Sequence, residues 1–350
     1  MSKYRIYVGS YTAKSADKFG AGKGISICDF DSGNTIDLVS VNTDCKDPSF
    51  LLLNGKMLYA AEEMPESTLS AYLISEGRLK RTKTLQLHQK DTCHIQLTSD
   101  GKFLSAANYG SGSLSLIGLT PDGQLADPVC TVVHQGSSIH PRQTAPRVHS
   151  TLNAPDGRYL LAADLGTDTV TVYSQDRNGN LTEEPEMGVR VPAGRGPRHM
   201  AFSADGTRLF VVCEISSTLL VYPYDASSGI GELLEERELI PQTGNETNKA
   251  ADIHFSPDGR YLYVSVRGSD SIVMMSYANG SLGEMKWFPS YGKSPRNFCI
   301  TEDGKYLITA NELSGNIAII LRDRKTGMLA QCAAAMDIPR AVYVTSVMED

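Results

Sequence analysis

The chain has 350 residues, of which 41% are hydrophobic, and a formal net charge of −7 at pH 7. The basic residues form no cluster or stripe, which argues against nucleic acid and anionic membranes as partners. No apolar run approaches the roughly 20 residues of a membrane-spanning helix. Seven cysteines without a C-x-x-C pair are typical of a reduced protein rather than of a disulfide framework or a zinc site.

The first expected element is a strand over Lys3–Ser10, where apolar and polar side chains alternate. These residues lack the apolar core of a signal peptide. Together with the cysteine usage, this start of the chain predicts a cytoplasmic protein.

A hairpin signature then recurs along the whole chain. In six copies a turn glycine is followed two residues later by Leu, and Gly33-Asn34-Thr35-Ile36 is a looser seventh copy. Successive glycines are 44, 46, 56, 52, 49 and 47 positions apart, at Gly33, Gly77, Gly123, Gly179, Gly231, Gly280 and Gly327. One such unit cannot bury its own apolar face, so the copies must pack on one another.

A second turn marker lies between these hairpins. Asp-Gly or Asn-Gly precedes an apolar run at Gly55, Gly101, Gly157, Gly206, Gly259 and Gly304. Because these dipeptides favour tight hairpin turns, each unit is expected to hold four short strands, which we call A to D. In the third unit, A is expected over 148–154, B over 158–164 and C over 169–173.

Repeats of about 50 residues with four antiparallel strands each are typical of a β-propeller. The missing seventh A strand is predicted at Pro339–Val344, and Tyr4–Ser10 then supplies strand B of the same blade. We therefore predict an all-β fold: a seven-bladed β-propeller of four-stranded antiparallel blades, forming a single domain over residues 1–350. Its N- and C-terminal strands would share one blade, closing the ring without an open sheet edge.

Ionisable residues gather at one end of the predicted blades. Because strand A runs into the Asp-Gly turn and strand B runs back, the start of A and the end of B share a rim. Eight residues before the turn glycine stand His149 and Arg198, and eight residues after it stand Glu214 and Arg267. The middles of the same strands are apolar.

These four residues come from three consecutive blades and are predicted to be catalytic. The two guanidiniums suit an anion or a developing oxyanion, and His149 or Glu214 suits a general base that activates water. The alternative from the residues alone is that these charges pair to hold blades together, or that the propeller binds a sugar, peptide or protein without catalysis.

Six further rim residues are predicted to bind substrate: Glu63, Asn108, Asp164, Arg147, Arg296 and Arg340. For Asn108 and Asp164 the alternative is a turn or inter-blade hydrogen bond. Arg340 is aligned with Arg198 through its Pro-Arg pair. The long polar connection from Val133 to Val148 is expected either as a lip over the funnel, carrying Arg142 and Gln143, or as a solvated loop.

The remaining histidines point to no metal site. His199 should leave its strand on the face opposite Arg198, because side chains alternate, and His94 aligns with it. His88 and His254 lie in strand-like runs and are expected to be structural. Without a His-x-His pair or a Cys/His cluster, neither a metal nor another cofactor is expected, although a calcium ion held by backbone carbonyls in the central channel stays open.

A series of short motifs resembles a known family in its order. The most specific are Asp164-Leu165-Gly166-Thr167-Asp168 and Gly196-Pro197-Arg198-His199, with Ala107–Ser113, His149-Ser150 and Arg267-Gly268 around them. From Tyr7 to about Leu329, the chain resembles the seven-bladed propeller lactonases. That family includes the propeller type of bacterial 6-phosphogluconolactonase and the fungal carboxy-muconate lactonising enzymes.

The resemblance implies a cofactor-free lactone hydrolase acting on a small anionic sugar lactone, 6-phosphogluconolactone or a related compound. The active-site residues proposed for the family correspond to His149, Arg198, Glu214 and Arg267. A muconate-type lactonising reaction is the alternative within enzymes. The oligomeric state stays open.

Three residues depart from the family pattern. Arg147 stands where relatives often have the first His of a His-x-His pair, and Cys213 and Val266 replace Asn. Arg147 would either add an anion contact or only alter the lip. Val266 removes a polar group beside Arg267, so details of the substrate would differ.

Overall fold

The computed structural model describes residues 2–12, 21–240 and 248–349. The chain divides into two compact units, one of residues 1–51, 74–80 and 240–350 and one of residues 52–73 and 81–239. Almost all regular structure is strand, and the described residues contain a single helix, the short 3-10 helix η1 (Pro185–Met187). None of the described helical structure is long and apolar enough to cross a membrane.

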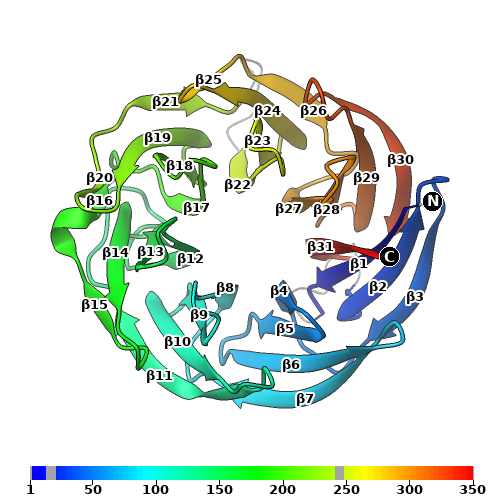
Figure 1. Cartoon of the computed structure of the whole chain (residues 1–350), viewed down its shortest axis with the longest axis horizontal. Coiled ribbons are helices and arrows are strands. Elements are labelled where there is room, and N and C mark those ends of the chain that lie inside the picture. Colours follow the sequence, from blue (N-terminus) through cyan, green and yellow to red (C-terminus); the bar gives the residue numbers. More distant parts are fainter. Residues whose placement is uncertain (1, 13–20, 241–247, 350) are drawn as a thin grey trace. The chain divides into compact units, whose positions relative to one another are not determined.

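The described strands form seven antiparallel sheets, the blades of a seven-bladed β-propeller, as predicted (Figure 1). Three sheets belong to the first unit. The first joins β1 (Lys3–Ser10), β2 (Ile25–Asp31), β3 (Ile36–Asn42) and β31 (Ala341–Glu349). The second joins β22 (Lys249–Phe255), β23 (Tyr261–Arg267), β24 (Ser271–Ala278), β25 (Ser281–Leu282) and β26 (Lys286–Pro289). The third joins β27 (Pro295–Ile300), β28 (Tyr306–Asn311), β29 (Asn316–Arg322) and β30 (Leu329–Asp337).

Three other sheets belong to the second unit. The first joins β8 (Thr92–Leu97), β9 (Phe103–Asn108), β10 (Ser113–Leu119) and β11 (Leu125–Val133). The next joins β12 (Val148–Asn153), β13 (Tyr159–Asp164), β14 (Thr169–Gln175), β15 (Leu181–Glu183) and β16 (Val189–Arg190). The third joins β17 (Pro197–Phe202), β18 (Arg208–Cys213), β19 (Thr218–Asp225), β20 (Gly229–Ile230) and β21 (Glu235–Glu238). The remaining sheet, of β4 (Pro48–Asn54), β5 (Met57–Glu62), β6 (Thr68–Ser75) and β7 (Arg78–Gln86), draws residues from both units.

The two ends of the chain meet in one sheet, which confirms the predicted sharing of a blade. β31 pairs antiparallel with β1, so that Val344 lies opposite Val8 and Ser346 opposite Ile6. β31 takes the position of strand A and β1 that of strand B. β1 is therefore paired on both sides, with β31 and with β2, and has no open edge.

The outermost strand differs from the prediction in three blades, where it is broken into two pieces. β15 and β16 both pair with β14, β20 and β21 with β19, and β25 and β26 with β24. In the first of these blades the break coincides with Pro185, which begins η1 and has no backbone N–H to give to the ladder. The four-stranded plan is kept, with a divided fourth strand.

The turns follow the sequence markers closely. Gly101, Gly157, Gly206, Gly259 and Gly304 all have φ between 68 and 71°, the left-handed conformation that these turns require. In four of these five turns the preceding Asp accepts a side-chain bond from Ser or Thr two residues earlier, as in Thr301 Oγ1 to Asp303 Oδ1 at 2.8 Å. Two hairpin glycines were misplaced, because Gly229 (φ 79°) rather than Gly231, and Asn34 (φ 70°) rather than Gly33, take the left-handed position.

The innermost strands carry a repeated irregularity near their first residue. The pairing of β12 with β13 skips His149, and the pairing of β17 with β18 skips Arg198. The register shifts near the start of the innermost strand in β8, β22, β27 and β31 as well. Two residues then oppose one, which is a β-bulge, and a bulge re-aims the side chain that it carries.

The core lies between neighbouring sheets and is built from their middle strands. In the second unit Leu161 of β13 and Val172 of β14 pack in one buried cluster with Val211 of β18 and Tyr222 of β19. All four are at most 1% exposed. These middle strands are thus buried between two sheets, which is why they read as continuous apolar runs.

Replacing Leu161 by Ala is expected to lower the free energy of unfolding by about 2–5 kcal/mol, because the core closes only partly around the cavity. Thermal and urea unfolding followed by circular dichroism measure the effect. Leu234→Ala is the control, since Leu234 is 55% exposed and should change stability by no more than about 0.5 kcal/mol. Equal effects of the two variants would contradict the packing described here.

Candidate active site

A buried carboxylate lies between two guanidiniums in the second unit. Glu214 Oε1 accepts from Arg142 Nη2 at 2.5 Å, and its Oε2 accepts from Arg198 Nε at 3.0 Å. Glu214 and Arg198 are 4% and 2% exposed. Each oxygen of the carboxylate is therefore held by a separate arginine, in charge-assisted bonds within a dry environment.

His149 lies in the same unit and is also buried. Its Nδ1 is 3.7 Å from Cys93 Sγ, and the same thiol contacts its carbonyl oxygen at 3.4 Å. The ring of Tyr109 meets the imidazole edge-on at 5.5 Å between centroids. Ser150 Oγ, one residue on, donates to the carbonyl of Arg198 at 2.6 Å and so joins the β12 and β17 strands that carry these two residues.

The β-bulges explain why these side chains gather. His149 and Arg198 are the extra residues of β12 and β17, and Glu214 directly follows β18, the partner of β17. The bulge also corrects the expectation for His199, whose ring lies 5.4 Å from that of His149 rather than away from the site. Strict alternation fails at this point because one residue is absorbed by the irregular pairing.

The predicted lip reaches this group. Residues 134–147 join β11 to β12, and Arg142 within them contacts Glu214. Gln143 is fully buried and anchors the segment, with Nε2 donating to the carbonyl of Leu165 at 2.8 Å and Oε1 accepting from the N–H of His140 at 3.1 Å. The segment is thus fixed by its own hydrogen bonds and is not merely solvated.

A second network holds both ends of the lip. Asp164 is fully buried, and its Oδ1 accepts the N–H groups of Arg147 at 2.7 Å and Gly166 at 2.8 Å. Its Oδ2 lies 2.8 Å from His134 Nδ1, and His134 Nε2 lies 2.8 Å from the Tyr173 hydroxyl. This placement favours a role for Asp164 in positioning the lip over one in touching substrate.

The other predicted binding residues of this unit lie in different settings. Asn108 is fully buried, with Oδ1 accepting from Thr92 Oγ1 at 2.7 Å and Nδ2 donating to Ser113 Oγ at 3.0 Å. Arg147 lies over the Tyr109 ring at 5.4 Å and donates to the Gly110 carbonyl at 3.1 Å. Glu63 is 7% exposed. Asn108 therefore ties strands together, whereas Arg147 packs on the ring that also contacts His149.

The first unit contains the remaining predicted site residues. Arg267 ends β23, and its Nη2 is 3.5 Å from the Ala250 carbonyl. The Arg296 guanidinium lies over the Tyr11 ring at 5.4 Å. The approach of Arg267 to the three residues of the second unit stays a prediction.

The alignment of Arg340 with Arg198 is wrong. In the last blade Ala341 pairs with Ser10 and Tyr343 with Gly9, so Val342 occupies the bulge. Arg340 precedes β31 with φ 58° and pairs through Nη2 with Glu312 Oε1 at 3.2 Å. The Pro-Arg pair misled the alignment because this blade has no Asp-Gly turn between its A and B strands.

Asp252 is a buried carboxylate that the sequence reasoning missed. It lies in β22 beside Ala251, within the irregular step of that strand. Its Oδ2 accepts from Asn297 Nδ2 at 2.5 Å and lies 2.9 Å from His254 Nε2. Counting eight residues back from the turn glycine selected Ala251. The irregular pairing of β22 leaves both Ala251 and Asp252 outside the regular register, which spacing alone does not show.

The site contains two bases and a concentration of positive charge. Burial lowers the pKa of Arg142, but the Glu214 carboxylate and the Tyr109 hydroxyl raise it by more, so that the pKa lies above its usual value. Arg142 and Arg198 therefore stay charged and are able to hold an anion or an oxyanion. His149 and Glu214 are the groups able to accept a proton.

Metal ligands were not expected, and the described residues include no group of three or more His, Cys, Asp or Glu placed to hold an ion. All seven cysteines are free thiols. Burial raises the pKa of Cys213 beside Glu214. Cys213 is thus a packing residue.

Comparison with known protein families shows to which family the chain belongs. The family profile described as "Lactonase, 7-bladed beta-propeller" matches residues 5–346. The chain belongs to the seven-bladed β-propeller lactonase family. The resemblance inferred from the motifs is therefore confirmed over nearly the whole chain.

Individual relatives extend over the full length of this lactonase-family chain. It is 28% identical over 352 residues to the 6-phosphogluconolactonase of Bacillus subtilis (strain 168), covering 98% of each chain. A crystal structure of a putative 6-phosphogluconolactonase from Bacteroides fragilis superposes with a TM-score of 0.89 at 30% identity, covering 99% of this chain and 98% of that one. The periplasmic gluconolactonase PpgL of Pseudomonas aeruginosa gives 0.91 at 28% identity, covering 99% of both.

The ion pair between His254 and Asp252 is expected to titrate above the usual range. Partial desolvation lowers the pKa of His254, whose side chain is 45% exposed, but the Asp252 charge and hydrogen bond raise it by more, so that the pKa lies above 6.5. The stability that the pair contributes is therefore present below about pH 6.5 and is lost as the pH rises through the folded-state pKa.

Two-dimensional NMR of the histidine side chains, titrated from pH 5 to pH 9, measures that pKa. Asp252→Asn should lower it, since the amide keeps the size of the side chain and removes its charge. A His254 pKa that stays the same in Asp252→Asn would contradict the assignment.

Proposed function

We propose that this chain hydrolyses a sugar δ-lactone, with 6-phosphogluconolactone as the leading substrate and gluconolactone as the second. The observation that carries the proposal is the Glu214 carboxylate held between Arg142 and Arg198, with Tyr109 contacting both Arg142 and His149. Membership of the lactonase family supports it. The printed names of the Bacillus and Pseudomonas relatives supply the two candidate substrates.

In the proposed reaction, His149 or Glu214 takes a proton from water, and the resulting hydroxide attacks the lactone carbonyl carbon. Arg198 and Arg142 stabilise the negative oxygen of the tetrahedral intermediate. The bond from that carbon to the ring oxygen then breaks, and the protonated base returns its proton to the ring oxygen. The carboxylic acid that forms loses its proton to solvent. The products are a carboxylate and a free hydroxyl group.

Arginines also suit the other end of the proposed substrate. A phosphate monoester carries about −1.5 to −2 charges at neutral pH. In our proposal Arg267, Arg147, Arg296 and Arg340 are the candidates for binding it, with Glu63 on the same rim. A cytoplasmic location remains a prediction of the same proposal.

The direct test is turnover by the purified full-length protein. Freshly prepared 6-phosphogluconolactone and glucono-δ-lactone are added separately in a pH-stat, and acid release is compared with spontaneous hydrolysis. Acceleration of either supports a lactonase, and the ratio of kcat/KM values assigns the preferred substrate. If neither is accelerated, the proposed activity is wrong and a binding propeller or a muconate-type reaction is favoured.

Glu214→Gln and His149→Ala are each expected to lower kcat by about 10²–10⁴-fold if the residue is the base. Because Arg198 is only 2% exposed, losing the Glu214 charge should also cost about 3–5 kcal/mol of stability. Rates are therefore measured well below each melting temperature, with the circular dichroism spectrum checked. Glu236→Gln, which breaks the exposed pair with Arg195, is the control that should keep full activity.

Arg142→Gln separates activity from stability more cleanly. The Arg142 side chain is 36% exposed, so its removal should leave the melting temperature nearly unchanged. Since it holds one oxygen of Glu214, kcat/KM should fall by about tenfold or more. Arg142→Lys should recover part of the lost activity. Wild-type activity in Arg142→Gln would show that the lip segment takes no part in catalysis.

A further inference from the structure

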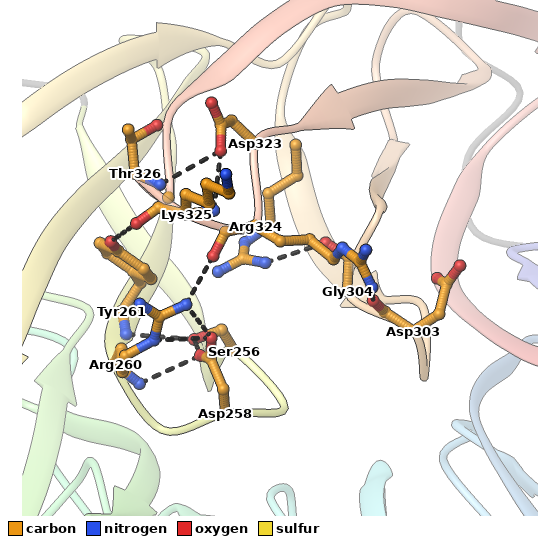
Figure 2. Close-up of polar contacts among 12 residues, drawn as sticks. Ser256, Asp258, Arg260, Tyr261, Asp303, Gly304, Asp323, Arg324, Lys325 and Thr326 are labelled. Carbon is orange, nitrogen blue, oxygen red and sulfur yellow. Dashed lines mark hydrogen bonds and ion pairs between the residues drawn. The ribbon is translucent and has the colours of Figure 1, made fainter.

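A cleft of about 370 Å³ lies at the opposite end of β23 from Arg267. It is formed by the turns at residues 257–260 and 303–304 and by the hairpin that joins β29 to β30 (Figure 2). All three segments belong to the first unit. A strand of seven residues spans about 20 Å, so this cleft is distinct from the end of the blade that carries Arg267.

The hairpin beside the cleft is held rigidly. Asp323 Oδ1 accepts the N–H groups of Lys325 at 2.7 Å and Thr326 at 3.2 Å. Arg260 Nη2 donates to the carbonyl of Arg324 at 2.7 Å, and the Tyr261 hydroxyl donates to that of Lys325. Figure 2 shows these contacts and the side chain of Arg324 extending from the hairpin toward Gly304. Arg324 Nη1 also donates to the Asp303 carbonyl at 3.4 Å, a long contact that leaves its other N–H groups able to bind a ligand.

The lining of the cleft has more positive than negative charge. Arg260, Arg322, Arg324 and Lys325 line it, against Asp258 and Asp303. Asp258 is paired with Arg260 at 2.7 Å, and Asp303 is paired with Lys305 at 3.1 Å. Among the described residues, the three other lining cations form no ion pair with a carboxylate.

Arg322 is the unusual member of this group, because it is only 5% exposed. Its Nε donates to the Tyr263 hydroxyl at 2.6 Å and its Nη1 to the Gly304 carbonyl at 2.9 Å. Its Cζ lies 5.4 and 5.5 Å from the centres of the Tyr261 and Tyr263 rings. Within the described chain its buried Nη2 has no hydrogen-bond partner. A buried charge without a counter-ion is costly, and an anion seated in the cleft would offset it.

A similar cleft in the second unit lacks this excess charge. It has about 420 Å³ and is lined by Arg158 and Arg177 against Asp100 and Asp176. Its hairpin, at residues 174–177, occupies the place of the hairpin with Arg322, Arg324 and Lys325, and contributes one cation, Arg177, and one carboxylate, Asp176. The excess positive charge beside Arg322 therefore comes from the side chains of the hairpin between β29 and β30. It does not come from the Asp-Gly turn that recurs in most blades.

We propose that the cleft lined by Arg322, Arg324 and Lys325 binds a small phosphate dianion, as inorganic phosphate or as the phosphate group of a small ester. Three cations without carboxylate partners suit a group with two negative charges and three acceptor oxygens. The volume lies at the lower end of small-molecule sites and accommodates such a ligand. This proposal is independent of the lactonase activity, which it neither requires nor explains.

Isothermal titration calorimetry of the full-length protein with inorganic phosphate and, separately, with glycerol 3-phosphate at pH 8 tests the proposal. The double variant Arg324→Ala/Lys325→Ala should bind the better of the two probes about tenfold or more weakly. Its melting temperature without phosphate should match the wild type, because both side chains are exposed. The rise in melting temperature that phosphate gives the wild type should be lost.

Arg177→Ala is the matched control, since it removes a hairpin arginine from the charge-balanced cleft and should leave phosphate binding unchanged. Tighter binding of glycerol 3-phosphate would identify an ester as the ligand class, and tighter binding of inorganic phosphate would identify the free ion. The proposal is overturned if the wild type binds neither at millimolar concentration. It is equally overturned if the double variant binds as the wild type does, or if Arg198→Ala alone abolishes binding.

Discussion

The constraint on which the site depends is the irregular pairing near the start of the innermost strands, where β12 and β17 each carry one extra residue. A regular strand would send His149 and Arg198 to one face and their neighbours to the other. The skipped pairing instead lets these positions leave the ladder, and the backbone of the following residues continues into a fully paired sheet. Packing and the proposed chemistry are thus separated along one strand: the middle packs against the next blade, and the first residues carry the side chains that we propose to be catalytic.

A second constraint is the burial of charge. Arg198 is removed from water, and Glu214 supplies the opposite charge at 3.0 Å. Such a pair gives little net stability, because desolvation offsets most of the attraction, but removing one partner is costly. The pair therefore fixes geometry more than it holds the fold together. Arg142 adds a contact from the lip, so the position of residues 134–147 depends on the charge of the Glu214 carboxylate.

The same contact between an Asp-Gly turn and a hairpin occurs in two places with different surrounding side chains. At Arg158 and Arg260 the residue after the Asp-Gly turn reaches the hairpin of another sheet, and this contact holds hairpin and turn together. The scaffold is the same in both cases, and only the side chains around it differ. Around Arg260 those side chains are mostly cations, and around Arg158 they balance. Small changes on a fixed frame thus create distinct surfaces.

The sequence by itself determined the number of blades, the strand order and the sharing of one sheet by both chain ends. These follow from local rules: the period of the turn glycines, the Asp-Gly hairpins and the apolar alternation. It also selected His149, Arg198 and Glu214, because equal spacing from a turn places residues at equal heights on a blade.

Tertiary structure decided what local rules do not contain. The bulge cancels strand alternation, which is why His199 lies beside His149 and why Val342, not Arg340, matches Arg198. The contact of Arg142 with Glu214 joins residues 72 positions apart, and the buried roles of Asp164 and Asp252 depend on partners from other segments. Such pairings depend on how separate sheets pack, and no spacing along one strand records that packing.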